Sequence, residues 1–319
     1  PNRDFRPGFS PDRVSGCERG RCKTVAEFDL VDTDDVDSPG DEWEEIDVSD
    51  TEADRIARSR DREFSQFRER IKDADQFKVE ASVFDDATYG ALYKLVQDGH
   101  IEAFGGPIST GKEANVYSAL GGRAAADVLD TPDSPEVAVK VYRINASDFR
   151  DMRGYLDGDP RFEGIGSNKS DVVKAWVRKE YANLERARKA GVRVPEPIAV
   201  ERNVLVMELL GIDEGRAKRL SEVHVENPET AFEVVREYMR RLYDAGLVHG
   251  DLSEYNVVLH GEELVVIDLG QAVTVHHQNS REFLERDCHN VASFFRRQGL
   301  EIEDDDLLAF VTDDEDGDD

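Results

Sequence analysis

Cysteine is scarce in this sequence, and long apolar runs are missing from it. The three cysteines, Cys17, Cys22 and Cys288, are an odd number and provide no disulfide framework, which is typical of a protein in a reducing cytoplasm. Cys17 and Cys22 have the spacing of half a zinc site, but no second pair of ligands stands near them. No run of about 18 apolar residues occurs, so we expect a cytoplasmic protein with no membrane-spanning segment and no membrane partner.

Basic residues are few relative to acidic ones. The 319 residues include 41 Lys and Arg against 70 Asp and Glu, a formal net charge of −29. Self-repulsion of this size normally destabilises a compact state, unless concentrated salt shortens the screening length to about 3 Å. The excess of acidic over basic residues therefore indicates a halophilic source. It argues against a nucleic-acid binder with a clustered basic patch, although RNA contacts within a larger assembly stay open.

The chain is longer than one average domain, which favours a two-lobed catalytic unit with appendages. Residues 1–50 contain few apolar residues and become strongly acidic, which predicts a disordered extension. Residues 51–100 predict a helical extension, with an exposed helix over 51–70 and an amphipathic helix over 88–98. Residues 301–319 predict a solvated acidic tail.

Two motifs near the C-terminal end have the residue types of a phosphoryl-transfer centre. In Leu247-Val-His-Gly-Asp-Leu-Ser-Glu-Tyr-Asn256, Asp251 and Asn256 are five residues apart, the offset between the base and a magnesium ligand in a kinase catalytic loop. In Ile267-Asp-Leu-Gly270, Asp268 stands where kinases carry the metal-binding Asp of Asp-Phe-Gly. Either fragment alone is compatible with an ordinary turn or strand end. Both together, in this order, favour catalysis.

The chemistry of phosphoryl transfer explains these residue types. Magnesium prefers hard oxygen ligands, and the amide oxygen of Asn256 and the carboxylate of Asp268 are of that kind. Asp251 is then left to accept a proton from an attacking hydroxyl or to orient a water. The apolar runs 257–259 and 264–267, joined by a polar turn, predict a hairpin that brings Asn256 and Asp268 to one end.

A glycine-containing segment lies upstream of these motifs. Gly106-Pro-Ile-Ser-Thr-Gly-Lys112 begins like a Walker A loop, but Glu113 stands where that loop needs Ser or Thr, and the next residues have strand character. We therefore predict a strand–turn–strand phosphate cover, with close backbone approach at Ser109, Thr110 and Gly111. A single glycine stands where protein kinases usually have three, so this segment is a weak signal by itself.

Val137-Ala-Val-Lys140 strengthens the kinase interpretation. Lys140 has the sequence context of the lysine that contacts the α- and β-phosphates of a nucleotide. Residues 121–134 before it are expected to form a hairpin loop. A helix predicted over 169–190 carries Glu180, our candidate partner for Lys140; the alternative for such a Glu is a surface ion pair with a neighbouring Arg.

Apolar periodicity predicts the remaining regular elements, namely strands over 195–200 and 204–210 and helices over 228–244 and 280–297. The end of the second strand places Glu208 and Leu210 where a hinge between lobes offers backbone groups to adenine. Residues 145–170 are polar and rich in glycine. A segment of that length inside a compact domain is usually functional or disordered.

Five motifs together resemble those of the RIO family of atypical serine/threonine kinases, namely Ile108–Tyr117, Val137–Lys140, Trp176–Leu184, His249–Asn256 and Ile267–Gln271. The Ser-Thr-Gly-Lys-Glu-Ala-Asn form is similar to the type 1 branch, and we expect an archaeal member. The resemblance covers roughly residues 77–297.

The resemblance implies an α+β fold of the two-lobed protein-kinase type, trimmed of the usual activation and substrate-binding segments. A small β-rich N-lobe would span residues 101–210 and a helical C-lobe residues 211–300, with short helices before them. The flexible loop of the family matches residues 145–170.

The resemblance also implies ATP and Mg²⁺ as cofactors. Lys140 would contact phosphate and pair with Glu180, Asp251 would be the proton acceptor, and Asn256 and Asp268 would hold magnesium. Asp268 is also the position that becomes transiently aspartyl-phosphorylated in this family. The other expected nucleotide contacts are Ser109, Thr110, Gly111, Lys112, Glu113, Val116, Glu208 and Leu210.

The family's role would be final maturation of the small ribosomal subunit, partly as an ATPase that regulates its own association. The implied partners are a precursor of that subunit, with its protein and rRNA, and a protein substrate or the chain itself. Two residues depart from the family pattern: Gly250 stands where Ala is frequent, which we expect to be tolerated, and Gly270 replaces a Ser. The acidic residues 1–50 have no counterpart.

Two other functions are compatible with the sequence. A kinase-like small-molecule phosphotransferase shares the three catalytic positions, but the short distance from Asp268 to the last predicted helix leaves little room for an acceptor pocket. A nucleotide-dependent assembly scaffold with incidental turnover is less favoured, because every catalytic position is intact.

Overall fold

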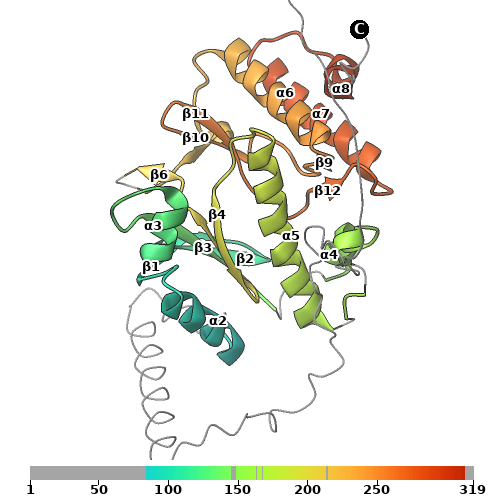
Figure 1. The fold of residues 1–319 in the computed structure, drawn as a ribbon. Helices are drawn as coiled ribbons and strands as arrows, with labels where there is room; N and C mark the ends of the chain where they lie inside the picture. Colours follow the sequence, from blue (N-terminus) through green and yellow to red (C-terminus); the bar gives the residue numbers. More distant parts are fainter. Residues whose placement is uncertain (1–83, 145–148, 163, 167, 213–214, 313–319) are drawn as a thin grey trace, which may run out of the picture. The chain divides into compact units, whose positions relative to one another are not determined.

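The computed structural model describes residues 84–144, 149–162, 164–166, 168–212 and 215–312 (Figure 1). The extension predicted over 1–50, the helix predicted over 51–70 and the end of the acidic tail lie outside these residues. The described chain has a sheet-rich N-terminal part followed by a helical C-terminal part, as expected for an α+β fold with two lobes.

The N-terminal part is built on one antiparallel sheet. Its strands, in spatial order, are β1 (Ala103–Thr110), β2 (Ala114–Leu120), β3 (Glu136–Tyr142), β5 (Val204–Glu208) and β4 (Pro197–Glu201). The central strand β3 is buried from Val137 to Tyr142, as its run of Val and Ala predicts, and Lys140 lies opposite Val116 of β2 and Leu205 of β5. Antiparallel pairing of β1 with β2 confirms the predicted strand–turn–strand unit, which lies beside the lysine-bearing strand.

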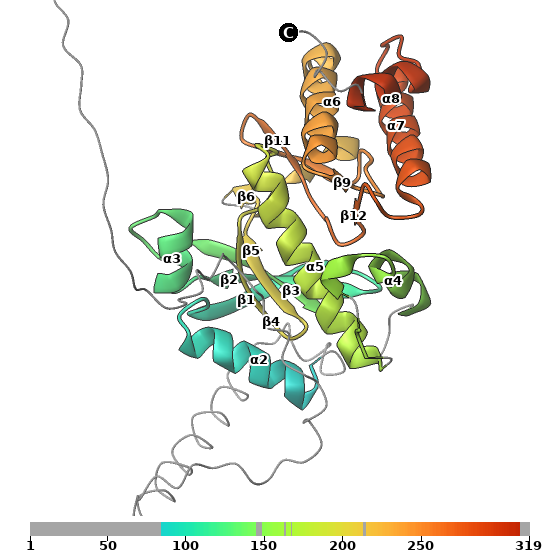
Figure 2. The same cartoon turned by 45° about the vertical axis from the view of Figure 1, so that its right-hand side comes forward.

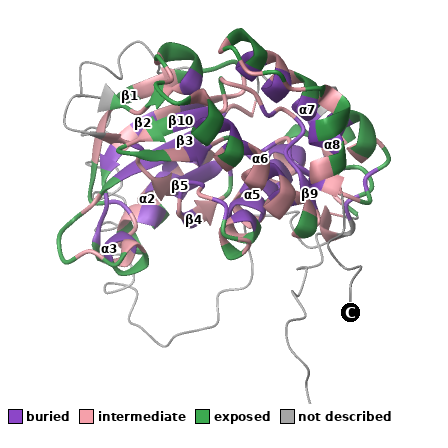
Figure 3. Cartoon of the chain, turned by 90° about the horizontal axis from the view of Figure 1, so that it is seen from above, coloured by how far each residue is buried: buried purple, intermediate pink, exposed green. Residues whose placement is uncertain are grey.

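Two helices flank this sheet. Helix α2 (Asp86–Gln97) begins at Asp85, whose side chain accepts the backbone N–H of Thr88, and it packs Leu92 and Leu95 into the core of the sheet. Helix α5 (Lys169–Lys189) begins at Asn168 and confirms the predicted helix over 169–190. Its buried face belongs to the core that it shares with the C-terminal helices (Figures 2 and 3).

The prediction of a hairpin loop over 121–134 is wrong. Residues Arg123–Leu129 form helix α3, with Ala125 and Ala126 buried. The run Ala124-Ala-Ala126 favours a helix, because alanine has the highest helix propensity. The Gly, Pro and Asp residues on either side are typical of a loop, and they led to the wrong prediction. The helix ends at Asp130, which adopts a left-handed conformation with φ +51°.

The C-terminal part contains two long helices and several short strands. The helices α6 (Pro228–Asp244) and α7 (Ser280–Arg297) have the predicted bounds. The predicted hairpin is β10 (Val257–His260) paired with β11 (Glu263–Val266). The other short elements are β6 (Gly211–Ile212), β7 (Gly215–Arg216), β8 (Lys218–Arg219), η4 (Leu220–Glu222), β9 (Leu247–Val248) and β12 (Val273–Thr274).

The acidic tail is not entirely solvated, contrary to our prediction. Helix α8 (Asp304–Thr312) packs against α6 and α7 and buries Leu307, Leu308 and Val311. The ring of Phe310 lies under the guanidinium groups of Arg236 and Arg240. Acidic residues occupy the first turn, where the helix dipole favours negative charge, so acidity and helix formation are compatible here.

The segment 145–170 is not a flexible loop throughout, which corrects another prediction. It contains helix α4 (Phe149–Leu156) and the single turn η3 (Pro160–Phe162). Met152 and Leu156 are buried, and the ring of Tyr155 stacks on Phe283 of α7 at 5.2 Å between centroids. Within the described part of the chain, no helix is long and apolar enough to cross a membrane.

Candidate functional site

A cavity of about 180 Å³ lies between the sheet and the β10–β11 hairpin. One end is mainly apolar, with Ala138 and Met207 from the sheet and Val258 from the hairpin, and Val116 lies between this end and Lys140. The other end is polar, where the side chains are Lys140, Glu180, Asn256 and Asp268. Such a cavity suits a molecule with a flat apolar ring at one end and negative charge at the other.

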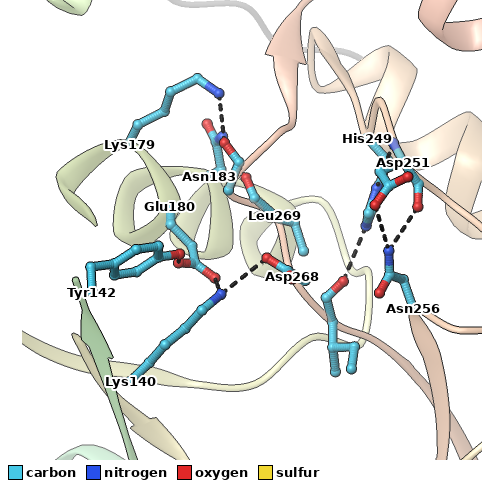
Figure 4. Close-up of polar contacts among 12 residues, drawn as sticks. Lys140, Tyr142, Lys179, Glu180, Asn183, His249, Asp251, Asn256, Asp268 and Leu269 are labelled. Atoms are coloured by element: carbon cyan, nitrogen blue, oxygen red, sulfur yellow. Dashed lines mark hydrogen bonds and ion pairs between the residues drawn. The ribbon is translucent and has the colours of Figure 1, made fainter. Parts of the chain in front are cut away.

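Three charged side chains meet at the polar end (Figure 4). The Nζ of Lys140 lies 2.7 Å from Oε1 of Glu180 and 3.0 Å from Oδ1 of Asp268. Burial would lower the pKa of the Lys140 ammonium, but the charges of Asp268 and Glu180 outweigh burial and raise this pKa well above its usual value. Lys140 is therefore a permanent cation, and the surface ion pair considered for Glu180 is excluded because Glu180 is buried.

Tyr142 is a site residue that our sequence reasoning missed. Its hydroxyl donates to Oε2 of Glu180, and its ring lies 5.1 Å from the Nζ of Lys140. Residues i and i+2 of a strand point to the same face, so Val-Lys-Val-Tyr contained the signal that Tyr142 follows Lys140. Both oxygens of the buried Glu180 carboxylate thus accept a hydrogen bond.

Asp268 directly follows the hairpin and has a left-handed backbone, with φ +64°. Its side chain is 53% exposed, open to the cavity. The ammonium of Lys140 lowers the pKa of the Asp268 carboxyl below its usual value. The neighbouring backbone N–H of Ile267 donates to the carbonyl of Asn256 at 2.9 Å, which confirms that the hairpin brings the two residues together.

Asn256 and Asp251 form the second polar group. The Nδ2 of Asn256 donates to the backbone oxygen of Asp251 at 2.8 Å and to its Oδ2 at 3.2 Å. The amide oxygen of Asn256 therefore points away from Asp251 (Figure 4). Burial raises the pKa of the Asp251 carboxyl, and the charge of Asp268 adds to this increase, as expected for a proton acceptor. Asp251 itself does not line the cavity.

Asp287 of α7 holds the backbone of the loop that carries Asp251, a role that our sequence reasoning missed. Its two carboxylate oxygens each accept a backbone N–H at 2.8 Å, from Gly250 and from Leu252. Gly250 has φ +79°, and a Cβ there would lie 3.1 Å from the carbonyl oxygen of Gln271. Glycine adopts this φ without strain, so Gly250 is more favourable here than the Ala that is frequent in the family.

The predicted hinge residues Glu208 and Leu210 lie at the wall of the cavity, and the side chain of Glu208 has partners of its own. The carboxylate of Glu208 accepts both Nη atoms of Arg193, at 2.6 and 2.7 Å. Arg193 also lies 3.1 Å from Glu263 of the hairpin, so it ties the sheet to the C-terminal part. With its side chain engaged, Glu208 can offer only backbone groups, like Leu210, and both residues line the cavity.

The β1–β2 turn is only partly at the cavity. Ser109 and Val116 line it. The other predicted nucleotide contacts, Thr110, Gly111, Lys112 and Glu113, are not among its lining residues. The N–H of Gly111 donates to the carbonyl of Ala114 at 2.9 Å, so the turn is closed by a backbone bond. The structure therefore does not bring these four residues into the cavity.

The donor set suits magnesium. In the described residues, no group of three or more His, Cys, Asp and Glu could hold a metal ion. Magnesium, however, usually takes only one or two protein oxygens and completes its shell with water and phosphate. The amide oxygen of Asn256 and the carboxylate of Asp268 fit this requirement, with Lys140 nearby to balance phosphate charge.

Comparison with known proteins agrees with this geometry. The RIO domain model matches residues 115–307. The chain is 71% identical over 294 residues to the RIO-type serine/threonine-protein kinase Rio1 of Haloferax volcanii, covering 92% of this chain and 98% of the relative. It is 36% identical to Rio1 of Methanocaldococcus jannaschii, covering 75% and 78% of the two chains.

The fold is also found among solved structures. A crystal structure of the Rio2 kinase from Chaetomium thermophilum, described as an ADP/Mg²⁺-phosphoaspartate complex, has a TM-score of 0.53 at 23% identity. The match covers 71% of this chain and 67% of that one. This match shows the fold alone, whereas the domain match and the two Rio1 relatives show that the chain belongs to the RIO family of serine/threonine protein kinases, in its Rio1 branch.

Proposed function

We propose that this protein is an ATP- and Mg²⁺-dependent serine/threonine kinase that also hydrolyses ATP. The observation that carries the proposal is the bridge from Glu180 through Lys140 to Asp268 at the polar end of the cavity. A buried cation held between two carboxylates beside open oxygen ligands is the arrangement that phosphoryl transfer needs.

Each side chain then has one task. Bound Mg²⁺ would neutralise the phosphate oxygens, and Asn256 and Asp268 are the residues that would hold it. Lys140 would contact the phosphates, and Glu180 would keep Lys140 in place. Asp251 would take the proton of an attacking hydroxyl or orient a water, for which its raised pKa is suited. Val116, Ala138 and Met207 would enclose the adenine ring.

The mutation Asp268→Ala tests the proposal. We expect Mg²⁺-dependent ATP turnover to fall below detection, because the site loses a metal ligand and the partner of Lys140. The matched control is Asp305→Ala, since Asp305 is an exposed carboxylate on α8 that does not line the cavity. Near-normal turnover by Asp268→Ala would reject the metal assignment.

We propose further that the protein acts in the cytoplasm on a precursor of the small ribosomal subunit. Membership of the RIO family supports this role. Affinity purification from the source organism, with the unsubstituted protein and with Asp251→Asn, would test it in ATP and in ADP. We expect both proteins to retain small-subunit precursors, and Asp251→Asn to retain more than the unsubstituted protein in ATP, because slowed turnover delays release. Absence of ribosomal particles in every sample would contradict the role.

The same purification separates the two alternative functions. A scaffold with incidental turnover would retain the precursor equally with either nucleotide and with either protein. A small-molecule phosphotransferase would retain none. The structure disfavours the latter, because only residues 269–279 separate Asp268 from α7, and β12 within them pairs with β9.

A further inference from the structure

Lys179, next to Glu180 on α5, is a buried amine without an ion pair. Its side chain is 0% exposed, and its Nζ donates to the carbonyl oxygens of Gly270, at 2.9 Å, and Ala272. The ring of Trp176 lies 5.2 Å from the Nζ. Among the described residues, no carboxylate forms an ion pair with it. Burying an amine without a counter-charge costs free energy, which points to a specific role for Lys179 at this place.

Asn183 lies one turn further along α5 and contacts the same segment. It is also 0% exposed, and its Nδ2 donates to the carbonyls of Leu269, at 3.1 Å, and Ala272, at 3.0 Å (Figure 4). Its Oδ1 accepts Nη2 of Arg161 at 3.0 Å. Arg161 thereby determines which side of the amide faces the carbonyls.

These carbonyls belong to the residues that directly follow Asp268. Helix α5 therefore contacts this segment twice: through Glu180 and Lys140 it reaches the Asp268 side chain, and through Lys179 and Asn183 it holds the backbone. The close fit continues at Gly270, where a Cβ would lie 3.0 Å from Nε1 of Trp176. A left-handed Asp268 is strained and needs such external restraint.

We propose that Lys179 and Asn183 are positioning residues that hold the backbone after Asp268 and thereby set the affinity of the site for Mg²⁺ with nucleotide. The proposal rests on the proposed function, because it assumes that Asp268 binds the metal. The competing interpretation is a core contact that contributes to stability alone. The two differ in whether metal affinity changes while the protein stays folded.

Two variants test the proposal. Lys179→Met removes the donor and keeps the apolar stem. Asn183→Asp is nearly isosteric, keeps an acceptor for Arg161 and places a carboxylate oxygen against two carbonyls. The control is Lys174→Met, on the same helix, where Lys174 pairs only with Asp171 at 3.5 Å near the surface. Circular dichroism and thermal unfolding establish that each variant is folded.

The first measurement is equilibrium binding of ADP by calorimetry at increasing Mg²⁺. The affinity for ADP should rise with Mg²⁺, and we compare the Mg²⁺ concentration that gives half of this rise. We expect this concentration to increase about tenfold or more in both variants, as is typical when residues that support a metal ligand are lost. ADP binding without Mg²⁺ and the Lys174→Met control should be unchanged. An unchanged Mg²⁺ requirement in a folded variant overturns the proposal.

The second measurement is hydrogen–deuterium exchange of the peptide that covers residues 268–275. Both variants should exchange faster there than the unsubstituted protein, whereas peptides from α6 should be unaffected. If Lys179→Met does not fold, Asn183→Asp decides the outcome. If the unsubstituted protein binds ADP equally with and without Mg²⁺, the proposed function fails; if it shows the Mg²⁺ effect and the folded variants retain it unaltered, only the positioning role fails.

Discussion

The Nζ of Lys140 lies 3.0 Å from Oδ1 of Asp268, which joins the sheet to the segment after the C-terminal hairpin. These residues are 128 positions apart in the sequence. Glu180 provides the second carboxylate at 2.7 Å. The relative placement of the two lobes is therefore part of the chemistry, because moving one lobe separates the cation from a metal ligand.

The hydroxyl of Tyr142 should matter for this bridge. In Tyr142→Phe, Oε2 of Glu180 loses its donor while buried, which costs about 1–3 kcal/mol. We expect the free energy of unfolding in urea to fall by about this amount and the KM for ATP to rise, since Lys140 loses a constraint. Tyr181→Phe, at a half-buried position of α5, is the matched control. Unaltered stability and KM would contradict the assignment.

Asp251→Asn should affect turnover rather than nucleotide binding. Asp251 lies outside the cavity lining, and loss of a general base typically slows a reaction by about 100- to 10,000-fold. We expect ATP turnover to fall within this range while ADP affinity stays within about threefold, since no wall of the cavity changes. Steady-state kinetics and calorimetry measure the two quantities. A large loss of ADP affinity would place Asp251 at the nucleotide instead.

A carboxylate beside bound ATP can itself accept the phosphoryl group. A carboxylate oxygen of Asp268 would bond to the γ-phosphorus as the bond to the bridging oxygen breaks and ADP leaves; water would later release phosphate. We expect label from γ-³²P-ATP on the protein that hydroxylamine removes, and none on Asp268→Asn. If Asp251 orients the water, label should persist longer on Asp251→Asn. Hydroxylamine-stable label throughout would indicate phosphoserine or phosphothreonine.

Lys179 should make stability depend on pH. Burial lowers the pKa of its amine from 10.5 to about 7, and Arg161 adds to this effect, whereas Asp159 and Glu180 oppose it. Between these values the unfolded chain binds one more proton, so stability rises with pH. Relative to Lys179→Met, the protein should gain up to about 1.4 kcal/mol per pH unit, with no further change below pH 7 or above pH 10.5. Urea unfolding across this range measures the difference, and a flat difference would contradict a neutral buried amine.

Salt should stabilise the folded chain. A net charge of −29 repels itself, and raising salt from about 0.1 to 1 M shortens the screening length from about 10 to 3 Å. We expect the free energy of unfolding to rise over this range of KCl and further at higher concentrations. Denaturant titrations in KCl measure this change, and indifference to salt would contradict a halophilic origin.

Much of the site was predictable because its residues stand in short local motifs. Asp251 and Asn256 occur at a fixed offset in one loop, and Lys140 ends a recognisable strand. Hairpin pairing followed from two apolar runs and a turn. Residues that act on backbone atoms were not predictable: Asp287 binds N–H groups 35 and 37 positions away, and any acidic residue of α7 could have had this role.

The sequence by itself determined the family, the order of the elements and the central polar residues Lys140, Asp251, Asn256 and Asp268. Motif spacing and apolar periodicity are local properties, so they can be read from short segments. Only the tertiary structure decided that α3, α4 and α8 form and pack, that Glu208 turns to Arg193, and that four residues of the β1–β2 turn stay outside the cavity. These outcomes depend on which distant surfaces meet, since burial and hydrogen-bond partners are properties of the packed chain and are not encoded in any short segment.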